Sequence, residues 1–481
     1  MRDAVLYEVF VRSFADSNGN GVGDLDGITG RLDYLRGLGV TAIWLTPIHP
    51  SPSYHGYDVT DYLSVNPDFG TTQDLLELVE AAHARGMRVI LDFVASHTSR
   101  YHPFFLDAYG NPDSPYSDWY LWKDPAHVTY QSFFGNESMP SVNHQTEAAN
   151  RYFIDVARHW MDLDGDGDYT DGIDGFRCDY ALGSPHAFWK ELRAALKALN
   201  PEVLLLGEVW VEDPVTQAPY FEDEFDALFD FPLYHVLQGS PEVAGDGLLG
   251  GGGFVSRLVN VVEEQHEVFP PHAVLVRFAG NHDTDRVASE VRGDEARMRL
   301  AAALVATAGG IPMLYYGDEV GLRGHKGNGP FYDEYRREPM PWTASGRGGG
   351  TPDWFADRRF DRPWDGVSVE EQDGDPGSLL NFYRHLYQVR AASPALRDGD
   401  YELLASAPED VWAFWRWTDD QVVSVLLNFG TDPATVRLDA ARAPGPVVDQ
   451  PVDLLTGRPV HLRGGAVRLN PAGVLLLDWT P

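Results

Sequence analysis

The sequence predicts a (β/α)₈ barrel that carries an irregular insert after its third strand and is followed by an all-β domain of the sandwich type. Three observations support this fold class. Short apolar runs alternate with segments of helical spacing over most of the 481 residues. Three of these runs lead into a carboxylate, as expected where the strands of a parallel barrel end at one face. Beyond Pro394 the pattern changes to short alternating strands.

The barrel elements follow one another in the order that this fold requires. Expected strands are short runs rich in branched and aromatic residues, and expected helices repeat their apolar residues at three- and four-residue spacing. The strands cover 4–11, 42–47, 89–92, 175–179, 204–208, 225–229, 274–278 and, with its exit, 311–319. The helices cover 28–38, 71–84, 148–163, 185–199, 254–268, 295–307 and 379–391.

One stretch interrupts this rhythm, and a different pattern ends the chain. Residues 99–144 are irregular, rich in Pro, Asp and aromatic residues, and too long for an ordinary loop. We therefore assign 1–98 and 145–393 to the barrel and 99–144 to an inserted domain. Residues 394–481 are assigned to a C-terminal β-sandwich.

The composition excludes two classes of partner. The chain carries 72 acidic against 37 basic side chains, a net charge of −35, whereas nucleic acids and anionic membranes require a positive face. The longest apolar stretch, 304–316, is interrupted by glycine and proline and is too short to span a bilayer.

One cysteine, Cys178, excludes an internal disulfide. Because Met1-Arg2-Asp3 leads directly into a strand-like run, we expect a cytoplasmic protein, or a secreted one if a leader was removed.

Three carboxylates follow strand-like runs: Asp179 after the fourth, Glu208 at the end of the fifth and Asp283 after the seventh. Arg177 lies two residues before Asp179 and therefore on the same face of the strand. Its guanidinium would keep Asp179 ionised and fix its orientation, as a carboxylate nucleophile requires. A structural salt bridge would leave the same local pattern. Cys178 should point away from both, into the packing around the barrel.

Two glycine-rich segments place oxygen-bearing side chains at alternate positions, a spacing that can fold ligands around a hard cation such as Ca²⁺. In the second segment, the carboxylates also repel one another unless a cation compensates them. An ordinary polar turn or a solvated acidic loop is the alternative in each case. The expected ligands are Asp16, Asn18, Asn20, the carbonyl of Val22 and Asp24 in the first segment, and Asp162, Asp164, Asp166, Asp168 and Asp171 in the second.

Taken in order, these motifs resemble those of the α-amylase family, the retaining glycoside hydrolases and transglycosylases that act on α-glucans. The resemblance covers nearly the whole chain and rests on several segments: 42–47, 55–58, 92–97, 175–181, 204–210 and 280–283. It implies that Asp179 is the nucleophile and Glu208 the general acid/base of a double displacement. It also implies that Asp283 binds sugar hydroxyls and stabilises the transition state.

The resemblance further implies a set of sugar contacts, with an aromatic ring stacked on the sugar where cleavage occurs. Ser96 stands where the family usually has the asparagine that helps to hold a calcium between barrel and insert. Tyr180, directly after the nucleophile, matches neither common family pattern, so linkage preference and endo or exo action stay open. The implied substrate-binding residues are Tyr57, Asp58, His97, Arg177 and His282.

We therefore expect a retaining hydrolase of α-1,4-linked glucans, nearest to the α-amylases and neopullulanases. We expect it to carry one or two structural Ca²⁺ ions and no organic cofactor, and to act as a monomer or weak homo-oligomer. The alternatives are an exo-acting α-glucosidase or oligo-1,6-glucosidase, a 4-α-glucanotransferase, and a non-catalytic glucan-binding protein, which normally shows a broken triad. The closely spaced aromatic residues Trp412, Trp415 and Trp417 are typical of a sandwich core, with a secondary sugar surface as the alternative.

Overall fold

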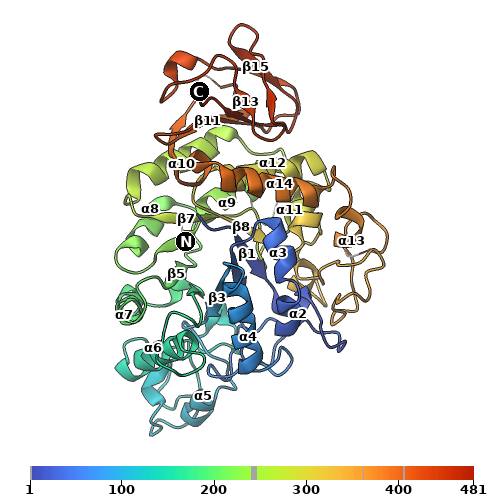
Figure 1. Ribbon diagram of the computed structural model, residues 1–481. Coiled ribbons are helices and arrows are strands. Elements are labelled where there is room, and N and C mark those ends of the chain that lie inside the picture. The colour runs from blue at the N-terminus through green and yellow to red at the C-terminus, as the bar shows by residue number, and fades with distance from the viewer. Residues whose placement is uncertain (1–2, 240–245, 361, 405–406) are drawn as a thin grey trace.

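Eight parallel strands close into a barrel at the centre of the molecule (Figure 1). The computed structural model describes residues 3–239, 246–360, 362–404 and 407–481; Met1 and Arg2, on which the expectation about a leader rests, lie outside them. Neighbouring strands pair in chain order, and β1 pairs with both β2 and β8, which closes the barrel. The strands are β1 (Leu6–Val9), β2 (Ala42–Leu45), β3 (Arg88–Phe93), β4 (Gly175–Cys178), β5 (Leu204–Gly207), β6 (Ala227–Phe229), β7 (Val274–Arg277) and β8 (Ile311–Tyr315).

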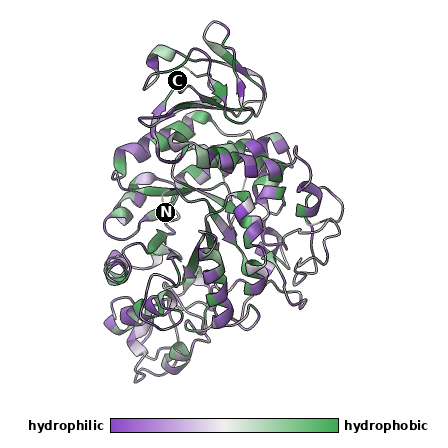
Figure 2. Ribbon diagram, in the orientation of Figure 1, coloured by the Kyte–Doolittle hydropathy of each residue, from purple (hydrophilic) through white to green (hydrophobic). Residues whose placement is uncertain are grey.

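Helices surround the barrel and carry both hydrophilic and hydrophobic residues (Figure 2). None of the described helices is long and apolar enough to cross a membrane. Their bounds are α1 (Val11–Phe14), α2 (Leu25–Thr29), α3 (Leu32–Leu38), α4 (Thr72–His83), α5 (Pro103–Ala108), α6 (Glu147–Met161), α7 (His186–Lys197), α8 (Pro214–Gln217), α9 (Phe231–Gln238), α10 (Val255–Val268), α11 (Val287–Glu290), α12 (Glu295–Thr307), α13 (Val369–Gln372), α14 (Leu379–Ala392) and α15 (Pro394–Asp398).

The single helix expected over 28–38 is two short helices, α2 and α3. Asp24 starts α2 three residues earlier than expected, because its side chain accepts a hydrogen bond from the Gly27 backbone N–H and caps the helix. Gly30 and Arg31 separate the two helices. The apolar spacing was still informative, since the side chains that suggested one helix are buried in both.

The barrel interior is filled by side chains from alternate strand positions, as in other barrels of this class. Trp44, Ile90, Leu206 and Phe229 belong to this inner cluster, and all are buried. The intervening residues face outward; Cys178 is one of them and packs in the layer between barrel and helices, as predicted. The polar side chains that line the barrel mouth lie beyond this apolar cluster, where the strands end.

The stretch between β3 and α6 contains α5, two short 3₁₀ turns at Ser117–Trp119 and Phe133–Gly135, and isolated β-bridges. Phe105, Ala108 and Tyr120 form a small apolar cluster of their own there. A bridge between His97 and Ser141 ties the end of this stretch back to the chain that leaves β3. The irregular segment thus lies against the end of the barrel where the strands finish.

The C-terminal strands form an antiparallel domain that packs against α10, α12 and α15 (Figure 1). Six strands lie in the order β14-β13-β16-β11-β10-β9, and β12 and β15 form a second, two-stranded sheet. Trp412 of β10 packs toward the barrel, whereas Trp415 packs toward the second sheet. Both are buried, which fits the core interpretation. The strands are β9 (Asp400–Leu403), β10 (Val411–Trp417), β11 (Val422–Asn428), β12 (Ala434–Arg437), β13 (Val452–Asp453), β14 (Arg458–Pro459), β15 (Ala466–Leu469) and β16 (Val474–Asp478).

Candidate active site

Arg177 contacts several carboxylates at the end of the barrel where the strands finish. It lies near the end of β4, points inward over the Trp44 ring at 5.0 Å, and has a side chain that is 1% exposed. Its Nη1 donates to Asp179 Oδ1 at 2.7 Å and to Asp92 Oδ1 at 2.9 Å, and its Nη2 lies 2.6 Å from Glu208 Oε1. One rigid guanidinium thus holds three carboxylates in fixed positions around it.

Asp179 follows the last residue of β4, so the strand places its side chain at the mouth of the barrel. Its backbone N–H donates to the Phe93 carbonyl at 3.0 Å, which fixes the main chain here. One carboxylate oxygen accepts from Arg177, and the other, Oδ2, is buried with no hydrogen-bond partner among the described residues. This leaves one oriented oxygen available to react with a bound molecule.

Glu208 follows β5 and is the partner carboxylate of Asp179. Its Oε2 accepts a hydrogen bond of 2.7 Å from the Tyr180 backbone N–H. Tyr180 adopts the left-handed conformation, with φ of 41°, which is unusual for a bulky residue. Burial, with help from the charges of Asp179 and Asp283, outweighs Arg177 and raises the pKa of Glu208 to about 7. A carboxylic acid that keeps its proton near neutral pH can act as a proton donor.

Asp283 lies beyond the end of β7 and has a different electrostatic environment. Its Oδ1 accepts from Arg337 Nη2 at 2.8 Å, and its Oδ2 lies 3.0 Å from His282 Nε2. Burial opposes ionisation of Asp283, but His282 and Arg337 outweigh it and hold its pKa well below the usual range. Burial likewise lowers the pKa of His282, yet Asp283 and Glu8 together raise it to about 10. The pair is therefore a carboxylate beside an imidazolium.

Tyr57 joins the two halves of this network. Its hydroxyl donates to Asp92 Oδ2 at 2.9 Å and lies 2.7 Å from His282 Nε2, and its ring stacks on the imidazole with centroids 5.3 Å apart. Burial raises the pKa of Tyr57 well above its usual range, so the hydroxyl keeps its proton. The aromatic ring is thereby held rigidly at the side of the cavity.

Two of the expected sugar contacts, Asp58 and His97, are held by hydrogen bonds within the chain. Asp58 is buried, accepts hydrogen bonds from the Ser51 hydroxyl at 2.6 Å and from the Ser53 hydroxyl, and lies outside the residues that line the cavity described below. Its role in the structure is to close its own loop. His97 does line the cavity, but its Nε2 donates to the Tyr57 carbonyl at 3.1 Å and its Nδ1 accepts from Ser96.

These groups border a cavity of about 680 Å³, within the range of small-molecule sites. The insert supplies one wall through Phe133 and Phe134, both of which pack against Tyr180; the Phe134 side chain is 79% exposed. Apolar rings and carboxylates therefore border the same cavity. Its lining consists of Tyr54, His55, Tyr57, His97, Phe133, Phe134, Met139, Asp179, Tyr180, Leu182, Glu208, Trp210, Asp283, Lys326, Asp333, Arg336 and Arg337.

Sequence reasoning did not assign a function to several members of this network. Arg337 donates to Asp283 and also to the His282 carbonyl at 2.9 Å, although 54 residues separate it from Asp283. Glu8 accepts from His282 Nδ1 at 2.6 Å across 274 residues. Asp92 carries a pKa that burial raises to about 6 despite the neighbouring Arg177. For Asp92 and Glu8 the signals in the sequence were a carboxylate at the end of β3 and a charged residue inside the first strand.

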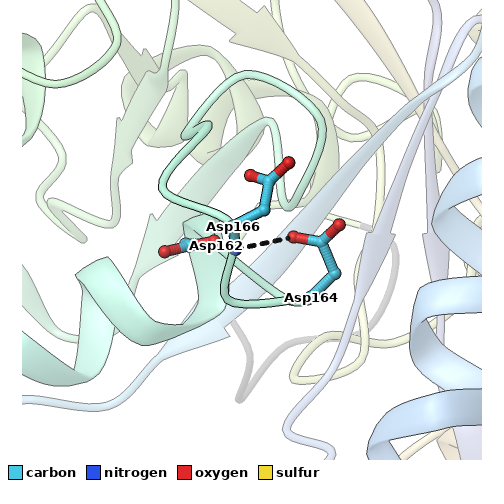
Figure 3. Close-up of side chains that lie close together, drawn as sticks. All are labelled: Asp162, Asp164 and Asp166. Carbon is cyan, nitrogen blue, oxygen red and sulfur yellow. Dashed lines mark hydrogen bonds between the residues drawn. The ribbon is translucent and has the colours of Figure 1, made fainter.

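The acidic segment after α6 brings three of its five expected ligands together. One carboxylate oxygen from each of Asp162, Asp164 and Asp166 lies within 4.8 Å of the others. Figure 3 shows the three side chains on one tight loop, where the Asp166 N–H donates to Asp164 Oδ1 at 3.2 Å. Asp168 instead accepts from Thr170, and burial with nearby carboxylates raises the pKa of Asp171. Hard oxygen donors at this separation fit a cation such as Ca²⁺.

The first glycine-rich segment is closed by its own hydrogen bonds. Asp16 accepts from the backbone N–H groups of Gly19 and Gly21 at 2.7 and 2.8 Å. Asn18 donates through its amide to Asp24 at 2.9 Å, and Asn20 accepts from the Val22 N–H at 2.8 Å. The expected side chains therefore turn into the loop, but here they hold backbone groups and one another.

Comparison with known proteins agrees with this geometry. Residues 8–399 match the family model described as the alpha amylase catalytic domain. The chain is 34% identical over 452 residues to alpha-amylase 3 of Dictyoglomus thermophilum, covering 89% of this chain and 85% of that protein. It is 30% identical to neopullulanase 2 of Thermoactinomyces vulgaris, covering 98% and 76%. The solved structure of the alpha-amylase from H. orenii superimposes with a TM-score of 0.81 at 31% identity, covering 100% of both chains.

The family match extends over the barrel, the insert and all three carboxylates. Members of this family are glycoside hydrolases that act with retention of configuration, and the paired carboxylates on Arg177 have the arrangement that such chemistry needs. The chain belongs to the α-amylase family and is a retaining glycoside hydrolase.

Proposed function

We propose that this protein hydrolyses α-1,4-glucosidic bonds in starch-type glucans and maltooligosaccharides through a covalent glycosyl-enzyme intermediate. The observation that carries the proposal is the pair of carboxyl groups on one guanidinium, with Asp179 presenting a free oxygen and Glu208 a pKa of about 7. In retaining enzymes the two groups lie about 5–5.5 Å apart. Asp179 and Glu208 contact the two terminal nitrogens of Arg177, which favours a close spacing of their carboxyl groups.

In the first step Asp179 Oδ2 attacks the anomeric carbon while the bond from that carbon to the leaving oxygen breaks. Glu208 transfers its proton to this oxygen, so the leaving sugar departs as a neutral alcohol. The positive charge that develops on the ring is stabilised by the ionised Asp283, which the imidazolium of His282 and Arg337 keep deprotonated.

In the second step the ionised Glu208 takes a proton from water, and the resulting oxygen nucleophile attacks the anomeric carbon. The ester bond to Asp179 breaks, both carboxyl groups return to their starting states, and the product keeps its α configuration. Two inversions give net retention.

The cavity walls support a glucan substrate. The Tyr57 ring offers an apolar surface to a pyranose, and Asp283 lines the same cavity and offers carboxylate oxygens to its hydroxyls. His282 is buried behind them and holds Asp283 in place. Phe133 and Phe134 extend the apolar surface beyond Tyr180, where a second sugar unit would lie. The relatives named alpha-amylase and neopullulanase support an α-glucan substrate, and the α-1,4 linkage is part of this proposal.

We also propose that Asp162, Asp164 and Asp166 bind a structural Ca²⁺, with the segment from Asp16 to Asp24 as a second candidate. Two observations support the first group: carboxylate oxygens of the three aspartates lie close together, and a cation would neutralise their negative charges. A bound ion would stiffen the loop that connects α6 to β4. It would lie outside the catalytic network and take no part in bond cleavage.

A product time course with maltoheptaose, pullulan and isomaltose tests this function, with Asp179→Asn as the blank. Maltooligosaccharides of mixed length at early times would support an endo-acting amylase, and panose from pullulan would favour neopullulanase activity. Glucose alone, above all from isomaltose, would indicate an exo-glucosidase, and products longer than the substrate a transferase. No product above the blank from any substrate would overturn the proposal.

A further inference from the structure

A second polar cavity lies between the barrel and the C-terminal sheet. It has a volume of about 420 Å³, large enough for a small ligand. Its walls come from the end of α10, the outer face of β7, the turn before β8, and strands β9 and β10. No catalytic side chain belongs to it. The cavity thus joins two parts of the chain that the catalytic site does not connect.

Arg416, on β10, is the unusual feature of this cavity. Its side chain is almost fully buried, at 4% exposure, and only its Nε has a hydrogen bond, which it donates to the Ala395 carbonyl at 3.2 Å. Neither terminal nitrogen has a hydrogen bond or carboxylate partner within the described ranges, although a guanidinium has five N–H donors. Leaving a buried charge without a partner is costly, so a fold normally supplies an anion or removes the charge.

Arg277, on β7, meets Arg416 at Gly309. Its Nε donates to the Gly309 carbonyl at 3.3 Å, and its Nη1 bonds Asp230 and the Gln265 amide oxygen. Nη2 has no partner in the part of the chain that the structure describes. If residue 309 had a side chain, its Cβ would lie only 2.2 Å from Arg416 Nη1 and would clash with it. Glycine at this position therefore lets the two guanidinium groups face the same space.

The charges around the cavity favour an anion despite the acidity of the whole chain. Three arginines line it: Arg277 is paired with the buried Asp230, and Arg397 lies 4.0 Å from the exposed Asp398. Arg416 has no carboxylate partner among the described residues, and the other aspartate at the cavity, Asp400, is exposed. Burial, together with neighbouring arginines, lowers the pKa of Arg416 to about 10, as expected for a cation crowded by like charge. A buried anion would relieve this repulsion.

The end of α12, whose last residue is Thr307, does not account for these free donors. A helix C-terminus attracts cations and helps to explain why arginines gather there. Arg390 differs from Arg416, because both of its terminal nitrogens donate to backbone carbonyls, those of Ala306, Leu396 and Gly310. Arg416 instead turns its terminal nitrogens toward the cavity.

We propose that this cavity binds a small phosphoryl ligand, a phosphate ion or a sugar phosphomonoester, through the paired guanidinium groups of Arg277 and Arg416. The planar fork of arginine matches the oxygen spacing of a phosphoryl group. Tyr401 and His266, whose rings lie 4.8 Å apart at the cavity wall, provide the surface against which a sugar would rest. A ligand held here bridges β7 of the barrel and β10 of the C-terminal sheet, and therefore stabilises the contact between them.

The test uses the full chain and follows the melting temperature during titration with potassium phosphate, glucose 1-phosphate or maltose, with potassium chloride at matched ionic strength. Phosphate should raise the melting temperature saturably by about 2 °C or more, and chloride and maltose should not. A larger effect of glucose 1-phosphate would identify the phosphomonoester as the preferred form; an equal effect would identify the free ion.

Arg416→Gln should abolish the shift, and Arg437→Gln should retain it, because Arg437 is an exposed arginine on β12 of the same domain and does not line the cavity. If Arg416→Gln does not fold, Arg416→Lys keeps the charge without the fork and should weaken phosphate binding about tenfold by calorimetry. Saturating maltoheptaose in an Asp179→Asn background should not displace phosphate. The proposal is overturned if the wild-type protein shows no saturable binding, if Arg416→Gln or Arg416→Lys binds like the wild type, or if maltoheptaose competes.

Discussion

Replacing Glu208 by glutamine removes the proposed proton donor while nearly preserving its shape. In the structure Glu208 Oε1 forms an ion pair with Arg177 Nη2 at 2.6 Å, and Oε2 accepts from the Tyr180 N–H. Glutamine has only one acceptor oxygen, so one of these donors loses its partner, at a cost of about 1–3 kcal/mol in unfolding free energy. The variant should therefore fold with a modestly lower melting temperature.

The size of the activity loss depends on the leaving group. General acid catalysis contributes typically about 10²- to 10⁴-fold, so kcat/KM on maltoheptaose should fall by that range in Glu208→Gln. α-Maltosyl fluoride releases fluoride, which needs no proton, and its glycosylation rate should fall far less. The comparison separates loss of the proton from general damage to the cavity, because damage would affect both substrates.

The wild-type pH profile follows from the same group. With a pKa of about 7, Glu208 is mostly protonated at pH 6 and about 1% protonated at pH 9, so kcat/KM on maltoheptaose should fall nearly tenfold per unit above pH 7. The sign is that of an acid whose protonated form is active: activity is lost as pH rises. Glu208→Gln should lack this limb. Equal losses on both substrates, or an unchanged alkaline limb in the variant, would refute the assignment.

Three other changes test the remaining parts of the site and fold. Asp179→Asn should lower kcat on maltoheptaose by on the order of 10⁴-fold or more with an almost unchanged melting temperature, and substantial residual activity would remove Asp179 as nucleophile. Asp164→Ala should lower the melting temperature and reduce its dependence on EDTA; a wild-type protein insensitive to EDTA would contradict a Ca²⁺ site there. Trp412→Ala should destabilise the chain by about 3–5 kcal/mol in denaturant unfolding, because Trp412 is fully buried, and a loss below about 1 kcal/mol would argue against its core role.

The elements that sequence patterns predicted well are those that local physics determines. Each barrel strand is a short apolar run, and the position of Asp179 two residues after Arg177 was enough to place both groups on one face. The same alternation placed Cys178 in the outer packing layer. Strand ends are also where the catalytic carboxylates had to be, since a barrel presents those ends together.

Other features depend on contacts that sequence spacing does not encode. Arg337 and Glu8 reach the His282–Asp283 pair from distant parts of the chain. Asp58 follows Tyr57 directly, yet its carboxylate is held by Ser51. The interruption between α2 and α3 follows from a cap at the start of one helix and a turn at its end, whereas the apolar periodicity runs through both.

The sharing of Arg177 between Asp179 and Glu208 has a consequence for the order of events in a catalytic cycle. Part of the proton affinity of Glu208 comes from the negative charge of Asp179 beside it. Once Asp179 is esterified by the sugar, that charge is gone while Arg177 remains, so the proton affinity of Glu208 must drop. The pKa of Glu208 therefore falls in the glycosyl-enzyme, so Glu208 stays ionised at the stage when it must accept a proton from water. The chemical state of one carboxylate thus times the change of role of the other, without any movement of the chain.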